Sequence, residues 1–223
     1  MAAKVALFMI TFATLKNGKM LLEKLKDYRI VLASKSPRRQ ELFKGMGIAF
    51  EVCQSDEEER LSPDWTPEEA VQQLAAQKAE TVFRRLASET SGGAGVRPLL
   101  VIGGDTVVVQ DGCILGKPRG REEAVRMLRG LSGRTHTVHS GLCVMTAEKC
   151  LLACDSTEVT FASLSEEEIN YYLDTYAPYD KAGAYGIQEW IGLTGISCIK
   201  GSFYGVMGLP TFTLWKLLQQ CLD

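Results

Sequence analysis

Short apolar runs alternate along this chain with longer segments in which apolar residues recur every three or four positions, a pattern typical of strands and amphipathic helices. The apolar run at residues 29–34 leads directly into Ser36 and Pro37, an N-cap followed by a proline at the first helical position. It predicts a strand, a tight turn and a helix that ends near Gly45 or Gly47.

A second strand is expected at residues 48–55, and a long helix from Thr66 through Leu86. Lys78 lies on a largely apolar face of that helix, because apolar residues precede and follow it at a spacing of about four. The other expected elements are a hairpin at 99–115 that turns at Asp111-Gly112, a helix at 121–133, two strands joined near 147–149, a helix at 165–175, a strand at 195–200, a turn at 201–210 and a closing helix from 211.

These elements mix strands and helices, with at least one antiparallel ribbon inside an alternating pattern. We therefore expect an α/β (α+β) fold built on a long, twisted, mixed β-sheet with flanking helices. Residues 28–223 are expected to form a single domain, and residues 1–27 an N-terminal extension outside it. The apolar run at residues 5–15 of this extension is too short for a membrane span, so no membrane segment is expected, although a targeting role stays open.

Charge and cysteine content exclude some functional classes. The 223 residues carry a net charge of −2, so we expect no nucleic-acid partner, because no overall positive field holds a phosphate backbone. Seven cysteines at irregular spacings, without a CxxC pair, are typical of reduced thiols in a cytoplasmic protein. Cys150, Cys154, His136 and His139 could form a zinc site, but their strand-like surroundings favour buried or cross-strand residues.

The turn after the first strand carries the strongest chemical signal. The hydroxyls of Ser34 and Ser36, the guanidinium groups of Arg38 and Arg39, and the N–H groups of a helix start converge there. A phosphate group fits all of these donors together. The alternative is a capped surface helix with solvated arginines, and neither a Walker loop nor a strand-linked GxGxxG occurs.

An acid interrupts the buried strand of the expected hairpin. Asp105, followed by Thr106, should meet a cation or lie at the open end of the strand, because an unpaired buried carboxylate is costly. A turn aspartate satisfied by backbone donors is the alternative. Lys117 lies on the same hairpin, whereas Lys78 could either join the site or extend its ammonium into water.

The segment 180–188 is rich in groups that bind ligands. It contains Asp180, Lys181 and Gln188, and the amide of Gln188 can both donate and accept at the edge of a base. A structured turn without a ligand is the alternative. Together with the arginine turn, the lysines and the acids, this segment predicts a pocket for a nucleotide polyphosphate.

Seven blocks of the sequence resemble the Maf family, in that family's order. They are LASKSPRRQELF, LAAQKAE, GGDTVVV, LGKP, MLRGLSGRTHTVHSG, DKAGAYGIQ and VMGLP, and they cover the chain from about residue 28 to its end. The resemblance implies two lobes around a central cleft, a fold related to the inosine triphosphate pyrophosphatases. It also implies a nucleoside triphosphate pyrophosphatase that cleaves between the α and β phosphates with a divalent metal, and it implies a homodimer.

Residue roles follow from the same resemblance. It assigns catalysis to Asp105, Lys78, Lys117 and a glutamate near 59, and substrate binding to Ser34, Ser36, Arg38, Arg39, Thr106, Asp180, Lys181 and Gln188. That glutamate is Glu59, or Glu58 if the match slips by one position; within the run 57–59, an ordinary solvated charge cluster is the alternative. Asp105 and Glu59 would hold Mg²⁺, with Mn²⁺ or Co²⁺ as substitutes.

The blocks containing Asp105-Thr106 and DKAGAYGIQ resemble family members that act on dTTP and UTP, so pyrimidine triphosphates are the expected substrates, with CTP and modified pyrimidines as further candidates. The chain departs from the family pattern at Gly104, at Ala177 and at Glu189-Trp190, and we expect Trp190 beside the base pocket. Two alternatives stay open: a house-cleaning pyrophosphatase for ITP or XTP, and a non-catalytic nucleotide-binding regulator of cell division.

Overall fold

The computed structural model describes residues 21–56, 60, 62–89 and 97–222, and within them seven strands form one mixed sheet. Its order is β2-β1-β3-β5-β6-β7, with β4 paired to β3 outside this path. The strands are β1 (Arg29–Leu32), β2 (Glu51–Val52), β3 (Leu99–Gln110), β4 (Cys113–Leu115), β5 (Thr135–Met145), β6 (Cys150–Phe161) and β7 (Ile196–Lys200). β1 runs parallel to β2 and β3, and the other described pairings are antiparallel.

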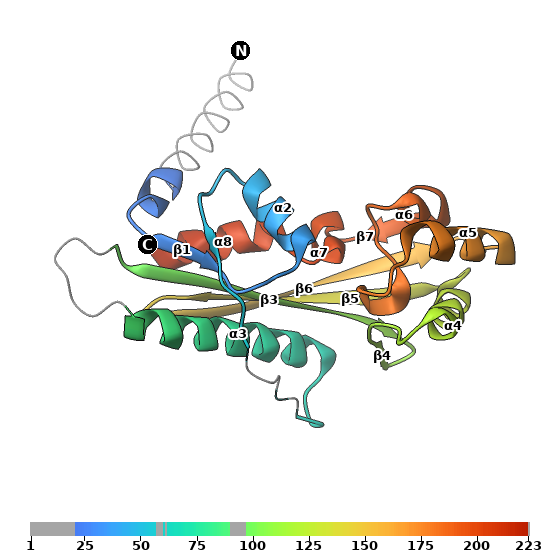
Figure 1. The fold of residues 1–223 in the computed structure, drawn as a ribbon, viewed down its shortest axis with the longest axis horizontal. Helices are drawn as coiled ribbons and strands as arrows, with labels where there is room; N and C mark the ends of the chain where they lie inside the picture. Colours follow the sequence, from blue (N-terminus) through green and yellow to red (C-terminus); the bar gives the residue numbers. More distant parts are fainter. Residues whose placement is uncertain (1–20, 57–59, 61, 90–96, 223) are drawn as a thin grey trace, which may run out of the picture.

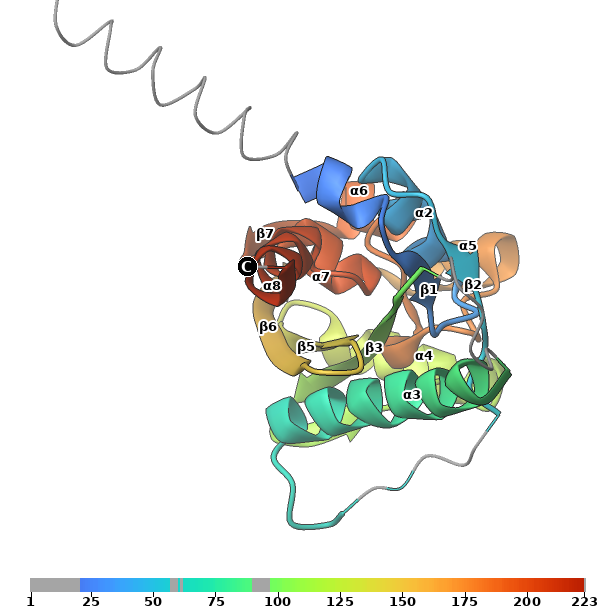
Figure 2. The same ribbon diagram turned by 90° about the vertical axis from the view of Figure 1, so that its left-hand side faces the viewer.

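Helices cover both faces of this sheet. They are α2 (Pro37–Gly45), α3 (Pro67–Glu89), α4 (Arg121–Leu131), α5 (Glu166–Tyr176), the 3-10 helix η1 (Ala182–Ala184), α6 (Trp190–Gly195), α7 (Phe203–Met207) and α8 (Thr211–Leu222). In Figures 1 and 2, α3 lies along one face of the long strands, and α2, α7 and α8 lie on the other. The expected long mixed sheet with flanking helices is confirmed.

Two glycines allow α3 to lie unusually close to the sheet. A Cβ atom added to Gly103 on β3 would lie 2.0 Å from the carbonyl oxygen of Ala75, and one added to Gly141 on β5 would lie 2.2 Å from that of Val71. Real Cβ atoms do not approach backbone oxygens so closely, so glycine is required at both positions. The close approach places the side chains of α3 beside the middle of β3.

Apolar side chains form separate cores at the two ends of the sheet. At one end, the clusters that contain Leu32 and Ala75 pack against α8 and α3 respectively. At the other end, Phe161 and Tyr172 belong to a cluster that joins α4, α5 and η1. This separation, with a pocket between the two ends, matches the two lobes that the family resemblance implied.

The packed part of the described chain begins before residue 28. Residues 21–25 are helical, and both Leu21 and Leu25 are buried in the core next to α8. The last residues of the expected extension therefore belong to the fold. The sequence pattern did not indicate this, because Lys24 and Lys26 lie next to these leucines and make the segment read as polar.

Three elements differ from the sequence-based expectation. β2 is only two residues long, because it pairs with β1 at two positions only. The expected turn at 201–210 contains α7, capped by the hydroxyl of Ser202, which accepts from the N–H of Gly205 at 3.0 Å, and ended by Gly208 at a φ of 116°. Helix α6 was also not expected, since its glycines and threonine are poor helix formers.

Each histidine considered for a zinc site already has a hydroxyl partner. His136 Nε2 lies 2.8 Å from the Tyr185 hydroxyl, and His139 Nδ1 lies 2.8 Å from Ser156 Oγ. Burial lowers the pKa of His136 to about 4, so its ring is neutral near pH 7. All seven cysteines are described, and each is a free thiol. Among the described residues, no helix has both the length and the apolar character that crossing a membrane requires.

Candidate active site

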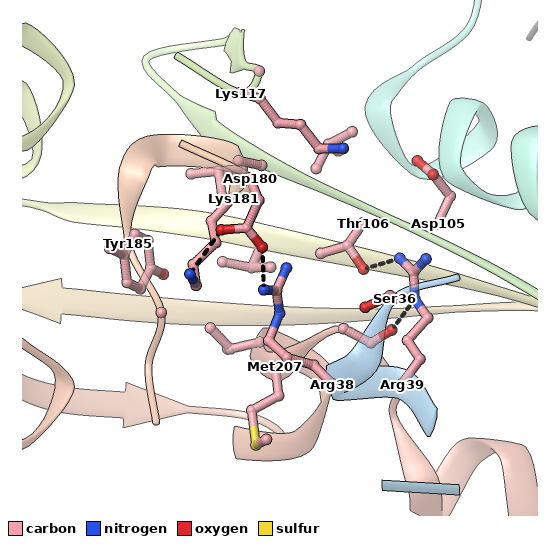
Figure 3. A pocket seen from close by; sticks show the side chains of 18 of the residues that line it. Ser36, Arg38, Arg39, Asp105, Thr106, Lys117, Asp180, Lys181, Tyr185 and Met207 are labelled. Carbon is pink, nitrogen blue, oxygen red and sulfur yellow. Dashed lines mark hydrogen bonds and ion pairs between the residues drawn. The ribbon is translucent and has the colours of Figure 1, made fainter. Parts of the chain in front are cut away.

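One pocket brings together eleven of the twelve residues that the sequence assigned to a site, and Figure 3 shows most of them. Its volume is about 510 Å³, a size typical of small-molecule sites. The eleven are Ser34, Ser36, Arg38, Arg39, Lys78, Asp105, Thr106, Lys117, Asp180, Lys181 and Gln188. The twelfth, Glu59, and its alternative Glu58 lie outside the described residues.

The pocket lies where the edge of β3 lacks a neighbouring strand. β1 pairs with β3 only as far as Ile102, and β4 begins to pair at Val108. As far as the structure describes the chain, residues 103–107 therefore have no strand on this edge. Because successive side chains of a strand point to opposite faces, Asp105 and Thr106 leave β3 on opposite sides of the sheet, and a ligand at this gap can reach both.

Asp105 meets the cation that a buried carboxylate requires. Lys78 Nζ lies 2.5 Å from Asp105 Oδ1, and the two side chains are 18% and 14% exposed. Lys78 comes from α3, which the two glycines bring close to β3 on the face that carries Asp105. The expectation that Asp105 meets a cation is confirmed, and the ammonium of Lys78 turns into the pocket.

Arg39 joins three segments of the chain. Its Nε donates to the carbonyl oxygen of Gly208 at 2.7 Å. Its terminal nitrogens donate to Thr106 Oγ1 at 3.1 Å and to Ser34 Oγ at 3.4 Å. The β1–α2 turn, β3 and the end of α7 thus hold the guanidinium. Its orientation is therefore fixed before an oxyanion binds.

The start of α2 faces the same pocket. Ser36 is the N-cap and Pro37 opens the helix, as the sequence predicted. The hydroxyl of Ser36 forms no capping hydrogen bond within the described residues, whereas Ser34 Oγ accepts from the Ser36 N–H at 3.2 Å. The positive end of the helix dipole therefore adds to the attraction that the arginines exert on an anion.

Asp180 connects the two ends of the molecule across the pocket. Its carboxylate oxygens accept from Arg38 Nη1 on α2 and from Lys181 Nζ, each at 2.8 Å (Figure 3). Burial alone would raise the pKa of Asp180, but the hydrogen bonds and charges of Lys181 and Arg38 outweigh it and lower the pKa to about 2. Asp180 is therefore ionised at neutral pH and keeps both cations at the pocket wall.

Two groups in the pocket are available to a ligand. Lys117 reaches over the pocket from the hairpin and has no hydrogen-bond or ion-pair partner within the described residues (Figure 3). The amide oxygen of Gln188 is buried, and it too has no hydrogen-bond partner in the part of the chain that the structure describes. A buried acceptor without a donor is costly, so this oxygen indicates where a ligand N–H would bind.

The balance of charge in the pocket favours an anion with an apolar part. Among the described lining residues, five side chains are cationic and two are carboxylates, although the whole chain carries a net charge of −2. An apolar region of the lining is provided by Val108, Leu115, Val138 and Tyr185. A strongly anionic group attached to a flat, partly apolar group fits both regions.

The residues present fit a magnesium ion that a phosphate ligand brings with it. Asp105 offers the carboxylate oxygens that Mg²⁺ prefers, but among the described residues no group of three or more His, Cys, Asp or Glu could hold a metal ion. Mg²⁺ is commonly bound by one or two carboxylates together with substrate phosphates and water. Asp105, with the ligand's own oxygens, meets that requirement.

Trp190, which the sequence placed beside the base pocket, does not line the pocket of the structure. Its ring packs against Tyr171 with ring centroids 4.9 Å apart, and Trp190 is not among the lining residues. The residue before it, Glu189, turns inward to Lys181 and to Tyr172. The sequence offered no signal for Tyr172, which reads as one more apolar position of α5.

Comparison with known proteins connects this pocket to a family. Residues 29–221 match the family model described as "Maf-like protein". A protein of Porphyromonas gingivalis (strain ATCC 33277) named "dTTP/UTP pyrophosphatase" is 50% identical over 200 residues, which cover 89% of this chain and 97% of the relative. Proteins of the same name from Parabacteroides distasonis and Bacteroides fragilis (strain YCH46) are 46% and 43% identical, covering 89% and 90% of this chain and 99% and 100% of the relatives.

Proposed function

Because this chain belongs to the Maf family, we propose that it is a nucleoside triphosphate pyrophosphatase that hydrolyses dTTP and UTP to the nucleoside monophosphate and pyrophosphate. The observation that carries the proposal is the surplus of cationic groups around Asp105, in a pocket that also has an apolar region. A triphosphate matches the cationic groups, and a pyrimidine base matches the apolar region.

Asp105 is the base in this mechanism. A water molecule attacks the α-phosphorus in line with the departing pyrophosphate, and Asp105 takes a proton from that water. Lys78 holds the carboxylate in place, and its positive charge attracts phosphate oxygens. The arginines at the start of α2 and Lys117 stabilise the negative charge on the α-phosphate and on the leaving group.

The divalent ion in this proposal is Mg²⁺, with Mn²⁺ or Co²⁺ as substitutes. Asp105 and Glu59 would hold it, and the bound ion would neutralise charge on the phosphate oxygens. The proposal also includes a cytoplasmic location and a homodimer. Seven free thiols support a reducing compartment, and the family resemblance supports the dimer.

Gln188 accounts for the preference for thymine and uracil. The Watson–Crick edge of these bases carries an N–H donor between two carbonyl acceptors, and an amide complements such an edge because it offers one acceptor and one donor. The buried amide oxygen of Gln188 lacks a donor within the described residues, which supports recognition of that N–H.

A nucleotide panel tests this function. Pyrophosphate release from dTTP, UTP, CTP, ITP and 7-methyl-GTP is measured with Mg²⁺ and inorganic pyrophosphatase, using phosphate detection. We expect kcat/KM for dTTP and UTP to exceed that for CTP at least about tenfold, because N3 of cytosine carries no proton and would leave the Gln188 oxygen without a donor. Preference for ITP would favour the house-cleaning alternative, and binding without release in Mg²⁺ and in Mn²⁺ would favour the regulator.

A further inference from the structure

The segment that carries Gln188 is a turn whose two ends bind the same hydroxyl group. The N–H of Glu189 donates to the carbonyl oxygen of Gly186 at 3.0 Å, which closes the turn Gly186–Glu189. The Tyr172 hydroxyl accepts from the Gly186 N–H at 3.0 Å and donates to Glu189 Oε2. Gln188 is therefore the third residue of a turn whose first and last residues are both hydrogen-bonded to Tyr172 of α5.

Glu189 has a second partner on the wall of the pocket. Lys181 Nζ lies 3.0 Å from Glu189 Oε1, and the two side chains are 10% and 18% exposed. Tyr172 is fully buried. Burial raises the pKa of its hydroxyl, and the hydrogen bond to Glu189 raises it further, so the hydroxyl keeps its proton and acts as the donor. One carboxylate thus connects the turn to α5 and to Lys181.

Close packing leaves the backbone of this turn little freedom. A Cβ atom added to Gly186 would lie 2.8 Å from the Glu189 carboxyl carbon, so this carboxylate rests directly against the start of the turn. A Cβ added to Gly192 on α6 would lie 1.8 Å from the carbonyl oxygen of Ile187. The main chain around Gln188 is held from both sides, and its side-chain oxygen is left without a donor within the described residues.

We propose that Glu189 is a positioning residue for base recognition: by binding Tyr172 and Lys181, its carboxylate fixes the turn so that the amide of Gln188 faces the base. This inference rests on the proposed function, because it assumes that the base lies against Gln188. Glu189 does not touch the base and acts through Gln188. Trp190, the neighbouring residue, packs on Tyr171 outside the pocket and has no such role.

Binding of the product monophosphates tests the inference without turnover. The affinities of wild type, Gln188→Ala, Glu189→Ala and the double variant for dTMP and for dCMP, whose N3 carries no proton, are measured by calorimetry. We expect Glu189→Ala and Gln188→Ala each to lower the preference for dTMP about tenfold, the effect of one lost buried hydrogen bond. The double variant should lose no more than Gln188→Ala alone, because Glu189 acts through Gln188. Losses that multiply in the double variant would overturn the inference.

Two further variants separate positioning from general destabilisation. Glu189→Gln keeps an acceptor for Tyr172 and should retain most of the preference for dTMP, whereas Trp190→Phe should leave it unchanged. For dTTP hydrolysis, Glu189→Ala should raise KM about tenfold and keep kcat within about threefold. A wild-type chain that releases no pyrophosphate contradicts the proposed function. An active wild type whose Glu189→Ala variant keeps its base preference contradicts only the inference.

Discussion

Asp105→Asn should lower kcat for dTTP hydrolysis by about 10³-fold and change the affinity for the nucleotide little. A general base typically contributes ~10²–10⁴-fold, and asparagine has the shape of aspartate without its proton affinity. The amide oxygen can still accept from Lys78, so the pocket keeps its geometry. Steady-state pyrophosphate release measures kcat, and calorimetry with a non-hydrolysable dTTP analogue measures nucleotide binding.

The matched control makes the same change at the other carboxylate of the pocket. Asp180→Asn weakens the contacts with Arg38 and Lys181 on the pocket wall, so we expect a change in KM larger than the change in kcat. Turnover of Asp105→Asn within tenfold of wild type, or a larger loss of kcat in Asp180→Asn, would remove Asp105 from the chemical step.

Gly103→Ala should destabilise the protein by about 3 kcal/mol, the size of effect seen when a well-packed core receives an extra methyl group. The added Cβ would lie 2.0 Å from the Ala75 carbonyl oxygen, and backbone on both sides must move to relieve that contact. For a chain of this length, the melting temperature should fall by roughly 10 °C. Lys78 moves with α3, so turnover should fall as well.

Gly104→Ala is the control at the neighbouring position. Its added Cβ would lie 3.5 Å from Arg39 Nε, which is ordinary van der Waals contact. We expect its free energy of unfolding, measured by urea denaturation, to stay within about 1 kcal/mol of wild type. Equal stability of the two variants would show that α3 does not depend on close contact with β3.

The opening unit of the fold was predictable because its signals are local. A short apolar run followed by Ser36 and Pro37 leaves few structures other than a strand, a turn and a helix, and β1 and α2 take that form. The hairpin turn was equally local: Asp111 and Gly112 both have positive φ, which this dipeptide tolerates.

The site itself depended on contacts that local patterns do not contain. Sequence alone indicated that Asp105 needs a cation but left Lys78 either in the site or in solvent, because the choice depends on how closely α3 approaches the sheet. Gly103 and Gly141 decide that distance, and their role appears only when the register of β3 and β5 is known. Residue chemistry indicated most of the candidate residues, and the family resemblance assigned their roles and added Glu59. The gap in the edge of β3 explains why the described candidates can meet one ligand.

The segment after Gln188 shows the limit of reasoning from residue type. A bulky tryptophan drew attention as a neighbour of the base, yet Trp190 packs against Tyr171. A charged residue in a loop such as Glu189 is expected to be solvated, but its contacts with the hydroxyl of Tyr172 and the ammonium of Lys181 hold it in a largely buried position. The apolar spacing of a helix does not indicate a polar partner on its apolar face, because tyrosine is counted as an apolar residue in that pattern.

Hydrolysis of dTTP in ¹⁸O-labelled water tests the central claim most directly, because it identifies the phosphorus that water attacks in this pocket. The account predicts that the label appears in dTMP and that the pyrophosphate is unlabelled, as read by mass spectrometry of both products. Label in the pyrophosphate, or release of orthophosphate in its place, would contradict attack at the α-phosphorus.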